Sequence, residues 1–176
     1  RMYNLNRKPD YYATRAIISS TDTLEKSQAK SQIIDKIFSD ERLYNNKNFK
    51  NDAMGVIFST ENQEEYEAKC LVIDKILSDE RLYGNENLMM YSGSIIQFSD
   101  YQEKSEARCL VTDKILSDEK LYNNEKIKMT LGNIIYGVCS IEQAQAKCQI
   151  IDKILSDDRL YGNKNIMNEI YSIIDC

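Results

Sequence analysis

Four Asp-Lys dipeptides are the most regular chemical feature of this 176-residue sequence. A row of carboxylates could bind cations, and a row of ammonium groups could bind phosphates. The aspartates recur at a constant interval of 39 residues (74 − 35, 113 − 74 and 152 − 113); they are Asp35, Asp74, Asp113 and Asp152. Because stacked helices lie about 8–10 Å apart, equivalent carboxylates cannot share one ion. We therefore expect an ion-pair ladder, in which the Asp of one unit contacts the Lys of another, or caps on neighbouring loops.

The sequence lacks residues that catalysis and metal binding commonly use. The sequence contains no histidine, which removes the common general base and the common zinc ligand. Its five cysteines form no C-x-x-C motif, and Cys70, Cys109 and Cys148 are equivalent in the repeat, so we expect small buried free thiols. The G-x-G-x-x-G, G-K-[ST] and G-x-S-x-G motifs are absent. We predict that the protein is not an enzyme and has no metal site and no cofactor.

An internal repeat explains the constant spacing. Residues 68–85 read AKCLVIDKILSDERLYGN and residues 146–163 read AKCQIIDKILSDDRLYGN, which differ at three positions. A period of 20 to 50 residues is typical of stacked repeats. We predict that residues 1–176 form a single repeat array of about four and a half units: a partial repeat at 1–17 and full repeats at 18–56, 57–95, 96–134 and 135–173. Because both ends resemble interior repeats, we expect a longer natural protein.

The apolar pattern within one unit is helical. Ala68, Val72 and Ile76 recur at i, i+4 and i+8, which predicts a helix over roughly 62–77. The apolar residues of 87–98 predict a second, shorter helix. Asp22 with Glu25, and Asp100 with Glu103, are typical of helix starts. The fold class is therefore predicted to be all-α, an α-solenoid of tandem helical hairpins that resembles the tetratricopeptide and HEAT classes in general plan but lacks the tetratricopeptide signature.

The segment between the two helices has two possible structures. The first helix could continue through 78–83, or it could end near Leu77 and restart at Ser78, because Ser and Asp are good N-caps. The position after this segment holds Gly or Asn in all four units, and these types best tolerate a positive φ. We therefore predict a left-handed residue that closes the helix. The positions are Asn45, Gly84, Asn123 and Gly162.

A Leu-Tyr pair recurs in every unit beside this position. A group that is present in all units most often serves stacking, so we predict that these side chains anchor the turn to the next repeat; an exposed aromatic ladder is the alternative. The predicted anchors are Leu43, Tyr44, Leu82, Tyr83, Leu121, Tyr122, Leu160 and Tyr161.

Positions that differ between units are better candidates for a specific ligand. The second helix is the variable one, and its most apolar stretch suits a partner helix or peptide, since Met is adaptable. The alternative is that this unit packs differently. The candidate partner-binding residues are Met89, Met90, Tyr91, Lys128 and Met129. We therefore predict a non-enzymatic scaffold that binds protein or peptide partners.

A row of basic residues offers nucleic-acid binding as an alternative function. The row consists of Lys30, Lys69, Arg108 and Lys147. The net charge of −5 argues against it, because non-specific affinity for nucleic acid comes mainly from neutralised phosphates. A structural spacer without any ligand is the third possibility.

The remaining sequence features bear on location. No apolar run approaches the roughly 18 residues that cross a membrane, and no signal peptide is visible after Arg1. An odd number of cysteines, expected as free thiols, favours a reducing, cytoplasmic location. The sequence leaves the oligomeric state open, because apolar ends could pair.

Overall fold

The computed structural model describes residues 21–175, and this part of the chain is all-helical, with twelve α-helices and no strand. The all-α prediction is therefore confirmed. The partial repeat expected at 1–17 and Cys176 lie outside the described residues.

Three kinds of helix alternate along the chain. Four long helices, which we call the first row, are α2 (Leu24–Phe38), α5 (Gln63–Ser78), α8 (Gln102–Leu116) and α11 (Ile141–Ser156). Four single-turn helices, the edge helices, are α3 (Glu41–Tyr44), α6 (Glu80–Tyr83), α9 (Glu119–Tyr122) and α12 (Asp158–Tyr161). Four helices of twelve residues, the second row, are α4 (Lys47–Phe58), α7 (Glu86–Gln97), α10 (Glu125–Tyr136) and α13 (Lys164–Asp175). Equivalent helices begin 39 residues apart, as in 63 − 24 and 102 − 63.

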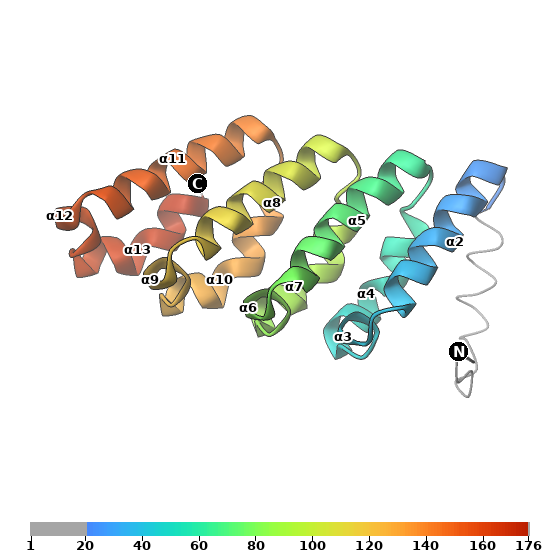
Figure 1. Cartoon of the computed structure of the whole chain (residues 1–176), viewed down its shortest axis with the longest axis horizontal. Helices are drawn as coiled ribbons and strands as arrows, with labels where there is room; N and C mark the ends of the chain where they lie inside the picture. The colour runs from blue at the N-terminus through green and yellow to red at the C-terminus, as the bar shows by residue number, and fades with distance from the viewer. Residues whose placement is uncertain (1–20, 176) are drawn as a thin grey trace.

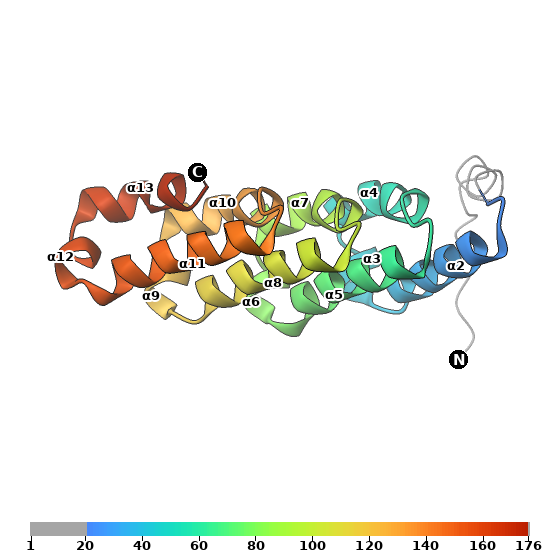
Figure 2. The ribbon, with the colours of Figure 1, turned by 90° about the horizontal axis from the view of Figure 1, so that it is seen from above.

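The helices form two layers. Each first-row helix packs against the next one, and each second-row helix does the same. Figures 1 and 2 show the long helices side by side in one layer and the second row behind them, with the edge helices along one border. Chain segments that follow one another therefore alternate between the layers, while equivalent segments stack within a layer.

The core lies between the two layers. Ala68, Val72 and Ile76, the residues that predicted the helical period, are all buried. On the second row, Leu88 and Ile95 of α7 are completely buried and face the same core. One apolar stripe per helix thus joins a first-row helix to its second-row neighbours, and burial of such stripes is the main favourable term in folding.

Two first-row helices, α2 and α8, have their N-caps one residue later than predicted. Thr23 is the N-cap of α2, and its hydroxyl oxygen accepts a hydrogen bond from the Lys26 amide at 3.2 Å. Asp22 instead forms an ion pair with the Lys26 ammonium at 3.0 Å. Tyr101 is the N-cap of α8 without a capping side-chain bond, and Asp100 pairs with Lys104 at 3.1 Å. The predicted caps were wrong because an acidic residue before a helix can pair with the lysine four residues later.

The helical conformation is interrupted between α5 and α6, at Asp79. This residue has extended backbone angles, and its carboxylate accepts the Arg81 amide at 2.8 Å, which caps the edge helix. The first helix therefore ends, as one of the two alternatives had it, and the restart is at Asp79 rather than Ser78.

The predicted left-handed residue is absent from the described residues, which contain no positive φ. Gly84 has a φ of −85°, and Asn45 has the same value. The reason is the following residue, an Asn with extended backbone angles that caps the second-row helix directly. In α7, for example, Asn85 Oδ1 accepts the Leu88 amide at 2.8 Å. An N-cap already reverses the chain here, so no left-handed turn is needed.

Two glycines set the closest approach between second-row helices. A Cβ atom at Gly93 would lie 2.1 Å from the Cβ atom of Asp52 on α4. At the equivalent Gly132, the backbone amide donates to Asn87 Oδ1 on α7 at 2.8 Å. A side chain at either position would push neighbouring helices apart.

We expect Gly93→Ala to lower the free energy of unfolding. Overpacking costs about 1–3 kcal/mol, and the 2.1 Å approach to Asp52 places this site at the upper end, above the roughly 1 kcal/mol that Ala gains over Gly in a helix. Gly137→Ser is the matched control, because Gly137 has helical backbone angles and no close contact at its Cβ position, and Ser59 occupies the equivalent position in the first unit. Urea unfolding monitored by circular dichroism measures both. Equal or greater stability of Gly93→Ala would contradict the close approach.

Candidate functional site

The repeated Asp-Lys pairs form a ladder along the first row. Lys36 Nζ lies 2.5 Å from Asp74 Oδ1, and Lys75 Nζ lies 2.6 Å from Asp113 Oδ1. Lys114 and Asp152 form the third pair. The expected ion pairs between units are confirmed. The aspartates are well exposed, so each pair contributes about 0–1 kcal/mol and aligns the helices more than it stabilises them.

The Leu-Tyr positions lie at the contacts between units. Leu43, Leu82 and Leu121 are completely buried, whereas Leu160 at the end of the row is partly exposed. Each of three tyrosines carries a cation from the preceding unit over its ring, at 4.8–5.3 Å from the ring centroid. The pairs are Arg42 with Tyr83, Arg81 with Tyr122 and Lys120 with Tyr161. These contacts favour the anchoring role over an open aromatic ladder.

The arginines of these pairs also reach the neighbouring backbone. The Arg42 guanidinium donates to the Leu77 carbonyl at 2.9 Å, and that of Arg81 donates to the Leu116 carbonyl at 3.1 Å. Both guanidiniums also pair with the carboxylate two residues earlier, and this lowers the pKa of Asp40 and of Asp79. One side chain thus joins an N-cap, a helix end and an aromatic ring.

The four residues of the nucleic-acid alternative, here called the buried cation row, lie inside the protein. Lys30, Lys69, Arg108 and Lys147 are at most 4% exposed. In these positions they cannot contact a phosphate backbone without unfolding of the helices around them. The sequence held a signal for their burial: each stands three residues before Ile33, Val72, Val111 or Ile150, which places it on the apolar side of its helix.

Lys69, Arg108 and Lys147 of the buried cation row bind the carboxyl ends of second-row helices. Lys69 Nζ donates to the Ser59 carbonyl at 2.6 Å, and Lys147 donates to the Ile174 carbonyl. The last carbonyls of a helix lack partners within the helix and carry partial negative charge. Lys69 and Lys147 therefore each satisfy a helix end in the other layer, and burial lowers the pKa of Lys69.

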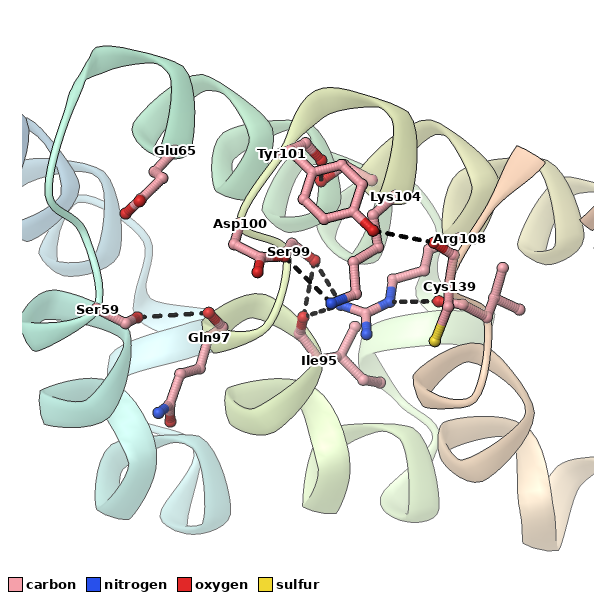
Figure 3. Close-up of polar contacts among 12 residues, drawn as sticks. Ser59, Glu65, Ile95, Gln97, Ser99, Asp100, Tyr101, Lys104, Arg108 and Cys139 are labelled. Carbon is pink, nitrogen blue, oxygen red and sulfur yellow. Dashed lines mark hydrogen bonds and ion pairs between the residues drawn. The ribbon is translucent and has the colours of Figure 1, made fainter. Parts of the chain in front are cut away.

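Arg108 shows this arrangement most completely (Figure 3). Its guanidinium donates to the carbonyl oxygens of Ile95, Tyr136 and Val138 at 2.5, 3.1 and 3.3 Å, and to Ser99 Oγ at 2.7 Å. Two second-row helices, α7 and α10, thus end on one side chain of α8. Burial of the guanidinium lowers the pKa of Arg108, because the charged form is less stable away from water.

The five candidate partner-binding residues differ in how far solvent reaches them. Met90 and Met129 are 50% and 64% exposed. Met89 is buried in the core, because neighbouring helical residues point in directions about 100° apart. Tyr91 is half-buried, and Lys128 lies over the Tyr122 ring at 5.8 Å and 3.6 Å from Glu125. Solvent thus reaches Met90 and Met129 most fully.

The two exposed methionines, here called the Met pair, are equivalent in the repeat (129 − 90 = 39). They lie on α7 and α10, which pack side by side. The same position holds Asn51 in α4 and Asn168 in α13. An apolar pair flanked by polar residues is therefore restricted to the middle of the second row.

The first row carries a comparable pair that sequence reasoning missed. Leu71 and Leu110 are each 38% exposed and are equivalent in the repeat, on α5 and α8. The corresponding residues in the outer units are the polar Gln32 and Gln149. A comparison of the four units at this position would have identified the pair from sequence, whereas a search for apolar helical stripes does not.

The cysteines of the described residues are free thiols. Cys70, Cys109 and Cys148 are partly buried rather than fully buried, which modifies the expectation from sequence. Burial raises the pKa of Cys109 to about 11. Cys139 is exposed in the turn between α10 and α11.

Comparison of the chain with protein families, with curated proteins and with solved structures found no match. Within residues 21–175, no three His, Cys, Asp or Glu side chains are grouped so that they could hold a metal ion. None of the helices in this range has the length and apolar character needed to cross a membrane.

We expect Arg108→Met to destabilise the protein by about 1–3 kcal/mol, because the buried carbonyls of α7 and α10 lose their donor. Arg159→Met is the control, since that guanidinium is 89% exposed and surface ion pairs contribute little. Urea unfolding of both variants makes the comparison. If Arg108→Met were as stable as the control variant, the helix-end contacts would not contribute measurably.

Thiol reactivity should follow burial. At about pH 8, iodoacetamide should modify Cys139 well before Cys109, because the thiolate is the nucleophile and burial raises the pKa of Cys109. Peptide mass spectrometry over time measures the two rates. In denaturant the two rates should converge. Faster modification of Cys109 in the folded protein would contradict its described environment.

Proposed function

We propose that this chain is an α-solenoid of 39-residue helical hairpins that binds a protein or peptide partner and catalyses no reaction. The observation that carries the proposal is the Met pair, two equivalent and exposed methionines on adjacent second-row helices. Each hairpin consists of a first-row helix, an edge helix and a second-row helix.

The stacking of equivalent helices supports the solenoid part of the proposal. The Asp-Lys ladder, the cation-on-tyrosine contacts and the cations buried under helix ends all recur from unit to unit. A repeat array of this kind contacts mainly its nearest neighbours and presents long continuous surfaces. The boundaries of the repeats remain those predicted from sequence.

The chemistry of the Met pair supports a protein or peptide partner. Methionine is flexible and polarisable, so it packs against varied apolar side chains, and an amphipathic helix is the usual ligand for such a surface. Contacts on both sides of each of these two second-row helices hold the backbone rigid. A rigid surface loses less conformational entropy on binding.

Nucleic-acid binding has less support. Its four candidate cations are buried, three of them bond to helix ends, and the net charge is −5. A spacer function predicts that no substitution on either exposed apolar pair alters an interaction. Capture of partners with charged variants of the two pairs therefore separates the three classes.

The test is affinity capture from lysate of the source cells with three baits. They are the wild type, Met90→Glu/Met129→Glu, and the matched control Leu71→Glu/Leu110→Glu, which places the same charges on the first row. Circular dichroism first verifies that each bait is folded. We expect a specific protein to be retained by the wild type and the control, and to fall at least about tenfold with the Met-pair variant, as at an interface hot spot.

Three results would contradict the proposal. Capture that ignores the Met-pair substitutions would move the site elsewhere. Capture that disappears after nuclease treatment would indicate nucleic acid. No specific partner for any bait would favour a spacer.

A further inference from the structure

The two exposed leucines of the first row lie on helices that are packed on both sides. Leu71 of α5 and Leu110 of α8 are each 38% exposed, although α5 lies between α2 and α8, and α8 lies between α5 and α11. Cys109 Sγ of α8 is 3.9 Å from the Leu71 carbonyl oxygen, so the two leucines stand at matching positions on helices in direct contact. Solvent reaches them because they lie on the side of each helix away from its buried core residues.

Glutamates occupy the same exposed stripes of α5 and α8. On α5, Glu67 stands four residues before Leu71 and Glu64 stands seven residues before it, which places the three side chains on one side of the helix. The equivalent stripe of α8 has the same composition, and every member of both stripes is exposed. We call these six residues the acidic leucine surface: Glu64, Glu67, Leu71, Glu103, Glu106 and Leu110.

The negative charge of this surface is uncompensated. Among residues 21–175 none of its four glutamates forms an ion pair. Glu67 and Glu106 accept hydrogen bonds only from the neutral side chains of Gln63 and Gln102, at 2.8 and 2.6 Å. The aspartates one turn beyond the leucines, in contrast, are paired in the Asp-Lys ladder.

The apolar and the acidic character change together between units. The units of α2 and α11 have Gln at the position of Leu71 and Gln at the position of Glu67; these residues are Gln32, Gln149, Gln28 and Gln145. Both units form the same ladder contacts with their neighbours, so stacking requires neither leucine nor glutamate here. The helix dipole does not account for Glu67 and Glu106 either, because both lie beyond the first turn of their helices.

We propose that the acidic leucine surface binds a basic amphipathic helix of a partner protein. Apolar side chains of that helix cover Leu71 and Leu110, and its Lys or Arg side chains pair with the four glutamates. Stacked helices lie about 8–10 Å apart, a distance that about seven residues of a helix span at 1.5 Å per residue. Residues seven apart also share one side of a helix, so the partner helix has apolar residues at i and i+7.

Charge selects this occupant. Nucleic acids and anionic membranes bind through cations, and uncompensated carboxylates repel both. Exposed ion pairs contribute little free energy, so burial of the leucines supplies most of the affinity and the glutamates orient the helix. This site goes beyond the Met pair, which lies on α7 and α10 in the other layer (Figure 2), and neither proposal depends on the other.

The first test measures binding of synthetic helices to the whole chain by fluorescence anisotropy. The probes are Lys-rich helices with two leucines three, seven or eleven residues apart, and a Glu-rich helix with leucines seven residues apart. We expect the Lys-rich helix with the seven-residue spacing to bind most tightly. Its affinity should fall as salt is added, because salt screens exposed charges, and the Glu-rich helix should not bind.

Substitutions taken from the other units test the contribution of each residue type. Leu71→Gln/Leu110→Gln should weaken binding of the best Lys-rich helix at least about tenfold, as at an interface hot spot. Glu67→Gln/Glu106→Gln should also weaken binding and should reduce its dependence on salt. Glutamine already stands at these positions in α2 and α11, so we expect both variants to fold, which circular dichroism verifies.

Two control variants alter the second row instead. Glu86→Gln/Glu125→Gln removes the same charge from exposed and equivalent positions of α7 and α10. Met90→Glu/Met129→Glu disrupts the Met pair. Both should bind the Lys-rich helix as the wild type does, so failure of the acidic leucine surface is distinguishable from failure of the Met pair.

The second test locates the bound helix. A carbodiimide joins adjacent Lys and carboxylate side chains, and we expect links from the probe to Glu67 and Glu106 rather than to Glu86 and Glu125. The proposal would be overturned if no Lys-rich helix bound saturably, or if Leu71→Gln/Leu110→Gln left binding unchanged. Links mainly to the second row, or equal losses in the control variants, would overturn it as well.

Discussion

The two helix layers depend on three cations that lie inside the protein and bond to helix ends, namely Lys69, Arg108 and Lys147. A buried charge without partners is costly, and the carboxyl end of a helix has unpaired carbonyls that are costly to bury. Lys69 and Arg108 satisfy both requirements at once, because each ammonium or guanidinium group crosses from a first-row helix to a second-row helix end. The direction of each second-row helix follows from this arrangement: its carboxyl end must lie over the basic residue of the first row.

The polar contacts between units serve a different purpose. The Asp-Lys ladder and the cation-on-tyrosine contacts lie near solvent, where ion pairs contribute little free energy. They are specific in geometry, however. Asn85 illustrates this: its side-chain oxygen caps α7, while its amide nitrogen donates to the Lys128 carbonyl of the next unit at 3.1 Å. The apolar stripes supply most of the stability, and these polar contacts select the alignment of one unit on the next.

Because contacts between layers and between units occupy most helix faces, few positions remain available to bind a ligand. The faces between neighbouring units and between layers are occupied, so only side chains that point away from both can vary. The Met pair on α7 and α10 and the leucines on α5 and α8 are such positions. Their apolar character is confined to the two middle units, where neighbours on both sides hold the helix.

The sequence by itself determined the helical character, the 39-residue spacing and the ion pairs between units, because each follows from the periodicity of residue types along the chain. Tertiary structure decided which side of a helix is covered. Lys69 and Met89 show the limit. A basic residue repeated in every unit suits a phosphate row as well as a helix-end contact, and Met89 and Met90 have the same chemistry in sequence. Only the packing of the helices against one another buries Lys69 on α5 and Met89 on α7 and leaves Met90 in solvent. The turn at Gly84 also became clear only in the tertiary structure. There the N-cap of the next helix, rather than a left-handed residue, reverses the chain.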